Sequence, residues 1–382
     1  MMNRVTRWPR WRFGLVLLGL SLALAAVHGC GGGSTVASLP GTGGTGYTSM
    51  GTITGFGSVK VNGVFYDDTL ASVTIDGQSR TSAALGLGML VTVHGQLGSV
   101  ATRGTASSFD SWSQAQGPVS QVGSNSFQVA GMSVTTDSGT VYLGVASSAA
   151  LPSGANVRVW GLPTRADLTQ WLATRVELLS AAPASIVSTG LVGSAGTQLN
   201  GLTLLGPLTP LTAGQAVRVS GNLTGTVLTV AAVQPLSTVP VSTNGSDGDG
   251  DVEGVVTQVS TPTRFMLGTL PVDASAAVFS GGTGVTTGSQ VEVTGSVING
   301  VFQASQVQLE SEADTTTVEI KGVISGFNSL ANFTVRGQLC DASGVSRLGG
   351  GQLKALANGV RVQLQGVKQG DVVQVTSISL SD

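Results

Sequence analysis

The chain is poor in the residues on which most catalytic and nucleic-acid-binding sites are built. Its 382 residues include 2 histidines and 2 cysteines, and only 10% are charged and 5% aromatic. Metal-dependent and nucleophilic catalysis usually need His, Cys or carboxylate groups that converge on one point. Beyond the first thirty residues the chain offers one histidine, His94, and one cysteine, Cys340. We therefore expect a protein that is not an enzyme and needs no cofactor.

Long helices are not expected either, since sustained Ala, Glu, Lys and Leu periodicity is missing. Instead, 56 glycines and alternating Val and Thr favour β-hairpins. One pattern, Gly-x-x-Val-x-Val-x-Gly with a single Leu variant, occurs five times. It begins at Gly88, Gly154, Gly214, Gly288 and Gly359. Apolar residues at every second position predict one half-buried strand in five copies.

Further strands surround each copy of this pattern. A tight hairpin precedes it, as at Asn62-Gly63, where both turn residues tolerate positive φ. An open sheet would expose unpaired edges, which closure into a barrel removes. The predicted fold is therefore all-β, a tandem array of about five small β-barrel repeats. They span residues 50–115, 116–183, 184–240, 252–312 and 317–382, and the third is shortened.

Residues 241–251 are predicted to form an acidic, glycine-rich linker, because no apolar residue lies between Val241 and Val252. We expect a hinge here that divides the repeats into two arms. Asp247, Asp249 and Asp251 alternate with glycine, and oxygen ligands at every second residue can hold calcium. The match to an EF-hand loop is poor, so a solvated linker is the alternative to a weak calcium site.

The N-terminus carries the features of an export signal. Four arginines precede the apolar run Phe13–Val27, which is shorter than the roughly 20 residues of a permanent membrane span. Residues 1–29 are predicted to be a signal peptide that is removed. The run ends at Val27-His28-Gly29-Cys30, which resembles a bacterial lipobox, with His28 as a departure from it. The resemblance implies that Cys30 is lipidated, and residues 30–49 would then be a flexible Gly/Ser/Thr-rich tether. An ordinary secretory signal is the alternative.

Charge and location restrict the partners. Removing residues 1–29 takes four of the 18 basic residues and none of the 20 acidic ones, which leaves a net charge near −6. Nucleic-acid binding needs clustered positive charge, so we expect no nucleic-acid partner. A lipid anchor would make the membrane a partner. By resemblance, the residue after Cys30, which is not Asp, favours an outer-membrane lipoprotein of the cell envelope, facing the periplasm or the cell surface.

The whole arrangement resembles a known family. A lipobox followed by tandem units with Gly-x-x-Val-x-Val-x-Gly is similar to bacterial secreted β-barrel repeats catalogued as a domain of unknown function. The closest stretches are Gly51–Gly95 and Val318–Gly366. The repeats also resemble OB-type barrels in length and strand count. The resemblance implies OB-like β-barrel repeats after a signal peptide and tether, and it transfers no catalytic residue.

Aligning the repeats also predicts where the two reactive side chains lie. Cys340 is equivalent to Tyr66, Val134, Leu204 and Val272, so we expect it to fill a barrel interior as a small hydrophobic residue. His94 occupies an outward position of the Val-x-Val-x-Gly strand. No Gly-x-Ser-x-Gly motif accompanies it, so a Ser-His-Asp site is not expected.

An aromatic surface on the second repeat is the strongest candidate binding feature. Val157 and Val159 point inward by alternation, so Arg158 and Trp160 share the outer face of their strand, and Trp171 lies in the same repeat. An outward Trp beside an Arg could stack on a sugar or on a peptide aromatic. Alternatively, Trp160 packs the second repeat against its neighbour.

Two functions follow from these expectations. The first is a non-catalytic, lipid-anchored envelope protein whose barrels act as a scaffold or spacer for protein partners. The second is an oligosaccharide- or peptide-binding module that uses Arg158, Trp160 and Trp171.

Overall fold

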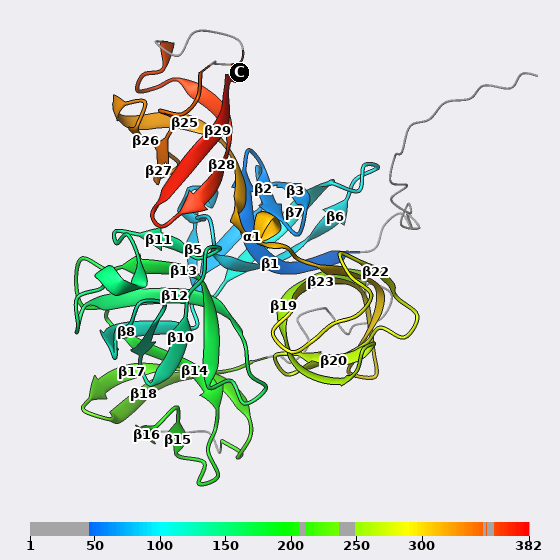
Figure 1. Ribbon diagram of the computed structural model, residues 1–382. Helices are drawn as coiled ribbons and strands as arrows, with labels where there is room; N and C mark the ends of the chain where they lie inside the picture. The colour runs from blue at the N-terminus through cyan, green and yellow to red at the C-terminus, as the bar shows by residue number, and fades with distance from the viewer. Residues whose placement is uncertain (1–45, 207–210, 237–248, 347–348, 350–354, 382) are drawn as a thin grey trace, which may run out of the picture. The chain divides into compact units, whose positions relative to one another are not determined.

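The computed structural model describes residues 46–206, 211–236, 249–346, 349 and 355–381. These residues belong to one compact unit, Pro40–Asp382. They form an all-β protein with barrel-like sheets, two 3₁₀ turns (Ser82–Ala84 and Ser148–Ala150) and one short helix (Figure 1). No helix in the described ranges is long and apolar enough to cross a membrane. Cys30 and Asp247 lie outside the described residues.

The first group of strands closes on itself. It comprises β1 (Tyr47–Phe56), β2 (Val59–Val61), β3 (Val64–Asp67), β4 (Ser72–Ile75), β5 (Gln78–Arg80), β6 (Leu90–Leu97) and β7 (Arg103–Ser111). Antiparallel pairings join β1 to β2, β2 to β3, β6 to β7 and β1 to β6. A parallel pairing of β3 with β7 completes the circuit, and the β4–β5 hairpin extends β7.

The second group repeats this circuit. It comprises β8 (Ala115–Ser120), β9 (Ser126–Val129), β10 (Met132–Thr135), β11 (Val141–Leu143), β12 (Asn156–Pro163) and β13 (Gln170–Leu178). The strands β8, β9, β10, β13 and β12 pair in that order, and β12 returns to β8. Again the single parallel step of the circuit joins the third strand to the last, β10 to β13.

The third group is smaller. It comprises β14 (Ile186–Leu191), β15 (Gln198–Leu199), β16 (Leu202–Leu205), β17 (Ala216–Thr224) and β18 (Val227–Pro235). Pairing runs from β14 through β17, β18 and β16 to β15, with β16 parallel to β18.

The last two groups follow the same scheme. One comprises β19 (Asp249–Thr261), β20 (Arg264–Leu267), β21 (Leu270–Asp273), β22 (Val278–Ser280), β23 (Gln290–Ile298) and β24 (Val301–Leu309). The helix α1 (Glu312–Thr316) leads to β25 (Thr317–Ser329), β26 (Asn332–Val335), β27 (Gln338–Asp341), β28 (Arg361–Gln369) and β29 (Val372–Leu380). Figure 1 shows the β19–β24 strands end-on as a ring.

The two glycines of the repeated pattern have separate structural roles. The first glycine always has a positive φ, between 76° and 92°, which residues with a Cβ rarely adopt. The last glycine follows a β-bulge in the central strand, as between His94 and Gly95 in β6. There a Cβ would overlap a carbonyl oxygen of the neighbouring strand in all five copies. The repeated pattern therefore specifies a turn and a β-bulge as well as a strand.

Apolar residues at alternate positions fill the interiors, as the sequence predicted. Val91 and Val93 in β6 are buried, as are Val362 and Leu364 in β28. Cys340 is buried among apolar residues, which confirms the interior position predicted for it. Burial also raises the pKa of its thiol to about 12, so the group stays protonated and unreactive at neutral pH.

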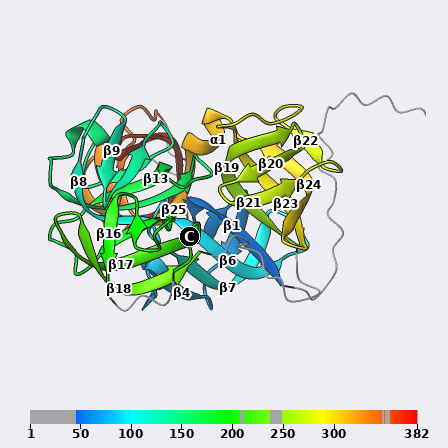
Figure 2. The same ribbon diagram turned by 90° about the horizontal axis from the view of Figure 1, so that it is seen from below.

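Strands from distant parts of the sequence pair with β1. Thr48–Met50 run parallel to Gly250–Val252 of β19, and Gly55–Phe56 run parallel to Glu319–Ile320 of β25. Figure 2 shows β1 among these strands. The prediction of two separate arms is therefore wrong. Residues 249–251, which were predicted to be linker, belong to β19, because their backbone pairs with β1 and β23.

Candidate functional site

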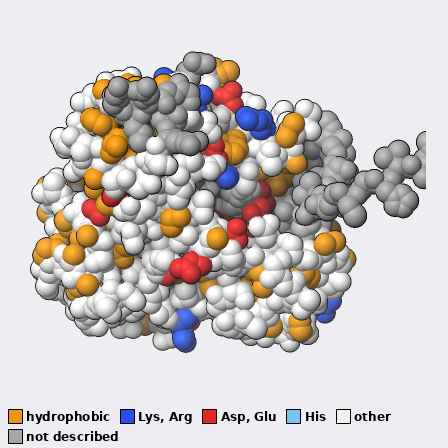
Figure 3. All heavy atoms as spheres, turned by 45° about the horizontal axis from the view of Figure 1, so that its top comes forward, with side chains coloured by type: hydrophobic (Ala, Val, Ile, Leu, Met, Phe, Trp, Pro, Cys, Tyr) orange, Lys and Arg blue, Asp and Glu red, His pale blue; other side chains and the backbone are white. Residues whose placement is uncertain are grey.

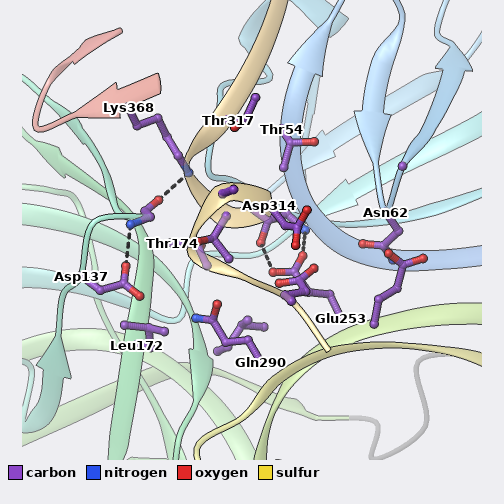
Figure 4. A pocket seen from close by; sticks show the side chains of 18 of the residues that line it. Thr54, Asn62, Asp137, Leu172, Thr174, Glu253, Gln290, Asp314, Thr317 and Lys368 are labelled. Atoms are coloured by element: carbon purple, nitrogen blue, oxygen red, sulfur yellow. Dashed lines mark hydrogen bonds between the residues drawn. The ribbon is translucent and has the colours of Figure 1, made fainter. Parts of the chain in front are cut away.

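A polar cavity lies where four of the strand groups meet. Its volume is about 440 Å³, and we call it the junction cavity. Its walls come from β1 and β2, from the segment after β10, from β13, from β19, β23 and β24, and from α1 and β28 (Figure 4). Because these segments are far apart in the sequence, the cavity exists only when the groups are assembled.

Acidic groups outnumber basic ones around this cavity. The acidic residues are Asp137, Glu253, Glu292, Glu310 and Asp314, and the basic residues are Lys60 and Lys368. Figure 3 shows acidic side chains gathered around a hollow in one face of the molecule. In a chain with only 10% charged residues, this is a notable concentration of charge.

The acidic wall is set by strand register. Glu253 of β19 stands directly opposite Glu292 of β23, and Glu292 stands opposite Gln308 of β24. Their strand neighbours Val252, Val291 and Val307 are buried in the apolar cluster of the β19–β24 group. By alternation, the two glutamates therefore share the outer face of the sheet. Like charges directly opposite each other on adjacent strands destabilise the sheet when both are ionised.

This environment raises the pKa of the Glu292 and Glu310 carboxyl groups, which favours their protonated forms. Burial raises the pKa of Glu292 to about 8, with repulsion from Asp251 and Glu253 adding to the effect. Burial likewise raises the pKa of Glu310 to about 9, reinforced by Glu253 and Glu292. Both side chains line the cavity and are partly exposed. The surrounding protein nevertheless removes most of the water that would hydrate a free carboxylate, which disfavours the ionised form.

Glu253 and Lys368 are held by contacts between strand groups. The backbone N–H of Thr52 donates to Glu253 Oε2 at 2.5 Å, and the Thr52 hydroxyl donates to Oε1 at 3.0 Å. Burial raises the pKa of Glu253, and the bonds from Thr52 oppose that shift. Lys368 Nζ donates to the carbonyl oxygen of Gly139 at 2.5 Å. Burial lowers the pKa of Lys368 to about 8, although nearby Glu253 favours its charged form.

Thr174 adds a buried polar atom without a partner. The residue is 9% exposed and lines the cavity beside the bulge of β13. Its hydroxyl oxygen has no hydrogen-bond partner in the described part of the chain. Figure 4 shows Thr174 together with Asp137, Glu253 and Lys368 at the cavity. A buried hydroxyl without a partner is costly, so a bound group that could pair with it would be favoured.

The residues predicted to form an aromatic surface do not form one. Trp160 is 0% exposed, and its indole N–H donates to Ser111 Oγ at 3.0 Å. Its ring lies 5.8 Å from the Arg158 guanidinium carbon and 6.0 Å from that of Arg175. Trp160 does point away from the interior of its own group, but the β1–β7 group covers that face. Trp160 therefore packs the second repeat against a neighbouring group, which was the alternative to a binding surface.

Trp171 and Arg158 have structural contacts as well. Trp171 is buried in the core of the β8–β13 group, where its indole N–H donates to the Leu168 carbonyl at 2.9 Å. Arg158 donates to Gln116 Oε1 at 2.7 Å and lies 3.8 Å from a carboxylate oxygen of Asp76. A stacking platform that uses these three residues is not present, because the two indoles are enclosed by protein.

The predicted calcium residues are divided between two environments. Asp249 is exposed at the start of β19, whereas Asp251 is buried. Asp251 accepts hydrogen bonds from Asn62 Nδ2 at 2.9 Å and from the Tyr47 hydroxyl at 3.1 Å. Its pKa is raised to about 6 by burial, against the effect of these bonds. Within the described ranges, no group of three or more His, Cys, Asp or Glu side chains could hold a metal ion.

The junction cavity was not predicted from the sequence. Glu292 occupies the outward position between the two valines of the repeated pattern, where the other copies carry Thr92, Arg158, Arg218 and Gln363. Three of the five copies thus place a charge on the outside of a barrel. These charges were the feature of the sequence that could have indicated the cavity. In a chain with so few charged residues, charges at outward positions of a strand indicate contacts outside the barrel.

Comparison with protein families identifies a domain of unknown function in two regions of the chain. The family model described as Domain of unknown function (DUF5666) matches residues 116–177 and 253–308. These stretches cover most of the β8–β13 and β19–β24 groups. The predicted resemblance to such a domain is thus confirmed in two regions, which differ from the stretches Gly51–Gly95 and Val318–Gly366 on which it was based. No curated protein matches the chain.

Proposed function

We propose that the chain is a non-catalytic, lipid-anchored protein of the cell envelope, in which five OB-like barrels form one scaffold for protein partners. The observation that supports this proposal best is the pairing of β1 with β19 and β25, which joins residues about 200 and 260 positions apart in the sequence. A flexible chain of separate domains would not need such pairings. A scaffold that holds partners at fixed spacing would use them.

The strand circuits support OB-like repeats. Four of the groups contain three strands in a meander and a closing antiparallel pair, and the third strand runs parallel to the last, as in β3 with β7 and β27 with β29. A five-stranded barrel of this kind is typical of OB-type domains. The third group departs from the scheme, because no pairing joins β14 directly to β15 among the described residues.

Buried polar contacts between the groups support a single assembly. Arg218 of β17 donates to Asp76 Oδ1, in the β4–β5 turn, at 2.7 Å. Arg175 of β13 donates to the Leu87 carbonyl, before β6, at 2.7 Å. Such contacts fix the relative positions of the groups, because a buried guanidinium without its partner is costly. The oligosaccharide- or peptide-binding alternative loses its aromatic platform.

The lipid anchor is tested by replacing one residue. Cys30→Ser is expected to abolish fatty-acid labelling and to release the protein from the membrane fraction, because the thiol is the acylated group. The measurement is metabolic labelling with a radioactive fatty acid, followed by cell fractionation. If the wild type takes up no label and the variant still partitions fully with membranes, the anchor hypothesis is wrong. Equal solubility of both unlabelled proteins would support the ordinary secretory signal.

The scaffold role is tested separately from the anchor. Crosslinking in intact cells, followed by purification of the chain, should capture the same envelope proteins from the wild type in repeated experiments. Binding to a glycan array without any captured protein would contradict the scaffold proposal and favour a ligand-binding role.

A further inference from the structure

The carboxyl groups of Glu292 and Glu310 form no ion pair in the described part of the chain, although the charge of nearby Lys368 favours the ionised form of Glu310. No hydrogen-bond donor in the described part of the chain reaches the carboxyl group of Glu292 or Glu310. Of the two lysines at the cavity, Lys368 is already bonded to Gly139. The wall therefore combines two cross-strand glutamates, Glu253 and Glu292, with the unpaired hydroxyl of Thr174.

The volume of the cavity and the spacing of its acidic groups favour a small molecule over a metal ion as the ligand. A cavity of about 440 Å³ falls in the usual range for small-molecule sites, roughly 300–1,000 Å³. The described acidic groups do not converge closely enough to hold a metal ion. A ligand several atoms long could reach carboxyl groups on different walls at once, which a single ion could not.

We infer that the junction cavity binds a small organic cation that carries primary ammonium groups. One ammonium group would lie beside Glu292 and Glu310, where it would supply the direct ion pair that the protein does not provide. An ammonium group has three donors and no acceptor, which suits a wall of carboxylates, amide oxygens and a hydroxyl. Gln308 and Thr174 line the same cavity and can accept its remaining hydrogen bonds.

Binding would be linked to proton release. The carboxyl groups of Glu292 and Glu310 are largely protonated at pH 7, since their pKa values are about 8 and 9. An ammonium beside them stabilises the ionised forms and lowers these pKa values, so protons leave as the ligand enters. Apparent affinity should therefore rise from about pH 6 to pH 9, below the usual pKa of an alkyl ammonium of about 10.4.

The test uses isothermal titration calorimetry on the purified full-length protein, with three probes: putrescine, the neutral analogue 1,4-butanediol, and calcium chloride. Putrescine is expected to bind at pH 7.5, with a heat that differs between phosphate and HEPES buffers because protons are released. Glu292→Gln should weaken putrescine binding by about tenfold or more, since a charge-assisted hydrogen bond is lost. The matched control Glu312→Gln removes an exposed carboxylate outside the cavity and should leave affinity unchanged within twofold.

Glu292→Gln is expected to fold normally, because it removes a carboxyl group that no protein donor stabilises; Glu310→Gln serves as a second variant. The inference is overturned by an absence of putrescine binding, by equal binding of the diol, or by equal affinity in both variants and the wild type. Calcium binding that depends on Glu292 and excludes putrescine would overturn it in favour of a metal site. None of these outcomes bears on acylation of Cys30 or on captured partners, so the scaffold proposal can fail independently.

Discussion

Trp160→Ala is expected to lower the free energy of unfolding by about 3–5 kcal/mol, the usual cost of truncating a fully buried aromatic residue. The indole lies between strand groups, in an apolar cluster shared with Val93 and Phe109. Its removal leaves a cavity at that contact and takes the hydrogen-bond donor away from Ser111. The measurement is chemical denaturation followed by circular dichroism, with wild type and variant compared in the same denaturant.

Trp160→Phe is the matched control. It keeps most of the apolar volume and loses only the hydrogen bond to Ser111, so the expected cost is smaller than that of Trp160→Ala by at least half. If Trp160→Ala leaves stability unchanged but weakens the binding of a glycan or peptide, the indole is a surface platform and the packing assignment is wrong.

Asp76→Asn is expected to destabilise the protein by about 3 kcal/mol, the low end of the range for breaking a buried ion pair. Asp76 accepts hydrogen bonds from Arg218 Nη2 at 2.7 Å and from the Ser113 N–H at 2.8 Å. The Asn side chain keeps the shape and tolerates the φ of 52° at this turn. It removes the charge that balances Arg218, whose side chain is 9% exposed.

The control for this substitution is Asp167→Asn. Asp167 forms an ion pair with Arg165 at 3.4 Å, but both side chains are well exposed. The expected change is about 0–1 kcal/mol, because surface ion pairs contribute little. Equal effects of the two substitutions would mean that the Arg218 contact does not hold the strand groups together.

Local features of the structure could be predicted from the sequence because they depend on local physics. Alternation placed Val91 and Val93 inside a strand, and the Asn62-Gly63 pair forms the predicted turn, with φ of 47° and 71°. The equivalence of Cys340 to apolar residues in other copies predicted its burial. Each of these inferences needed only the period of a strand or the φ that a turn requires.

Contacts between strand groups could not be predicted in the same way. Alternation correctly placed Trp160 outside its own barrel, but it could not show that the β1–β7 group covers that side. The hairpin residue Asn62 also donates to Asp251, 189 positions further along the chain. An outward residue is exposed in an isolated barrel and buried in an assembly, and the sequence of one repeat does not distinguish the two. The acidic wall around Glu292 was missed for this reason.

Differential scanning calorimetry of the whole chain tests most directly whether the strand groups form one cooperative assembly. If the β1 pairings and the buried Arg218 and Trp160 contacts join the groups, we expect one transition in which the calorimetric enthalpy equals the van't Hoff enthalpy. Several separate transitions, or a calorimetric enthalpy several times the van't Hoff value, would show that the barrels unfold independently and would contradict a single cooperative assembly.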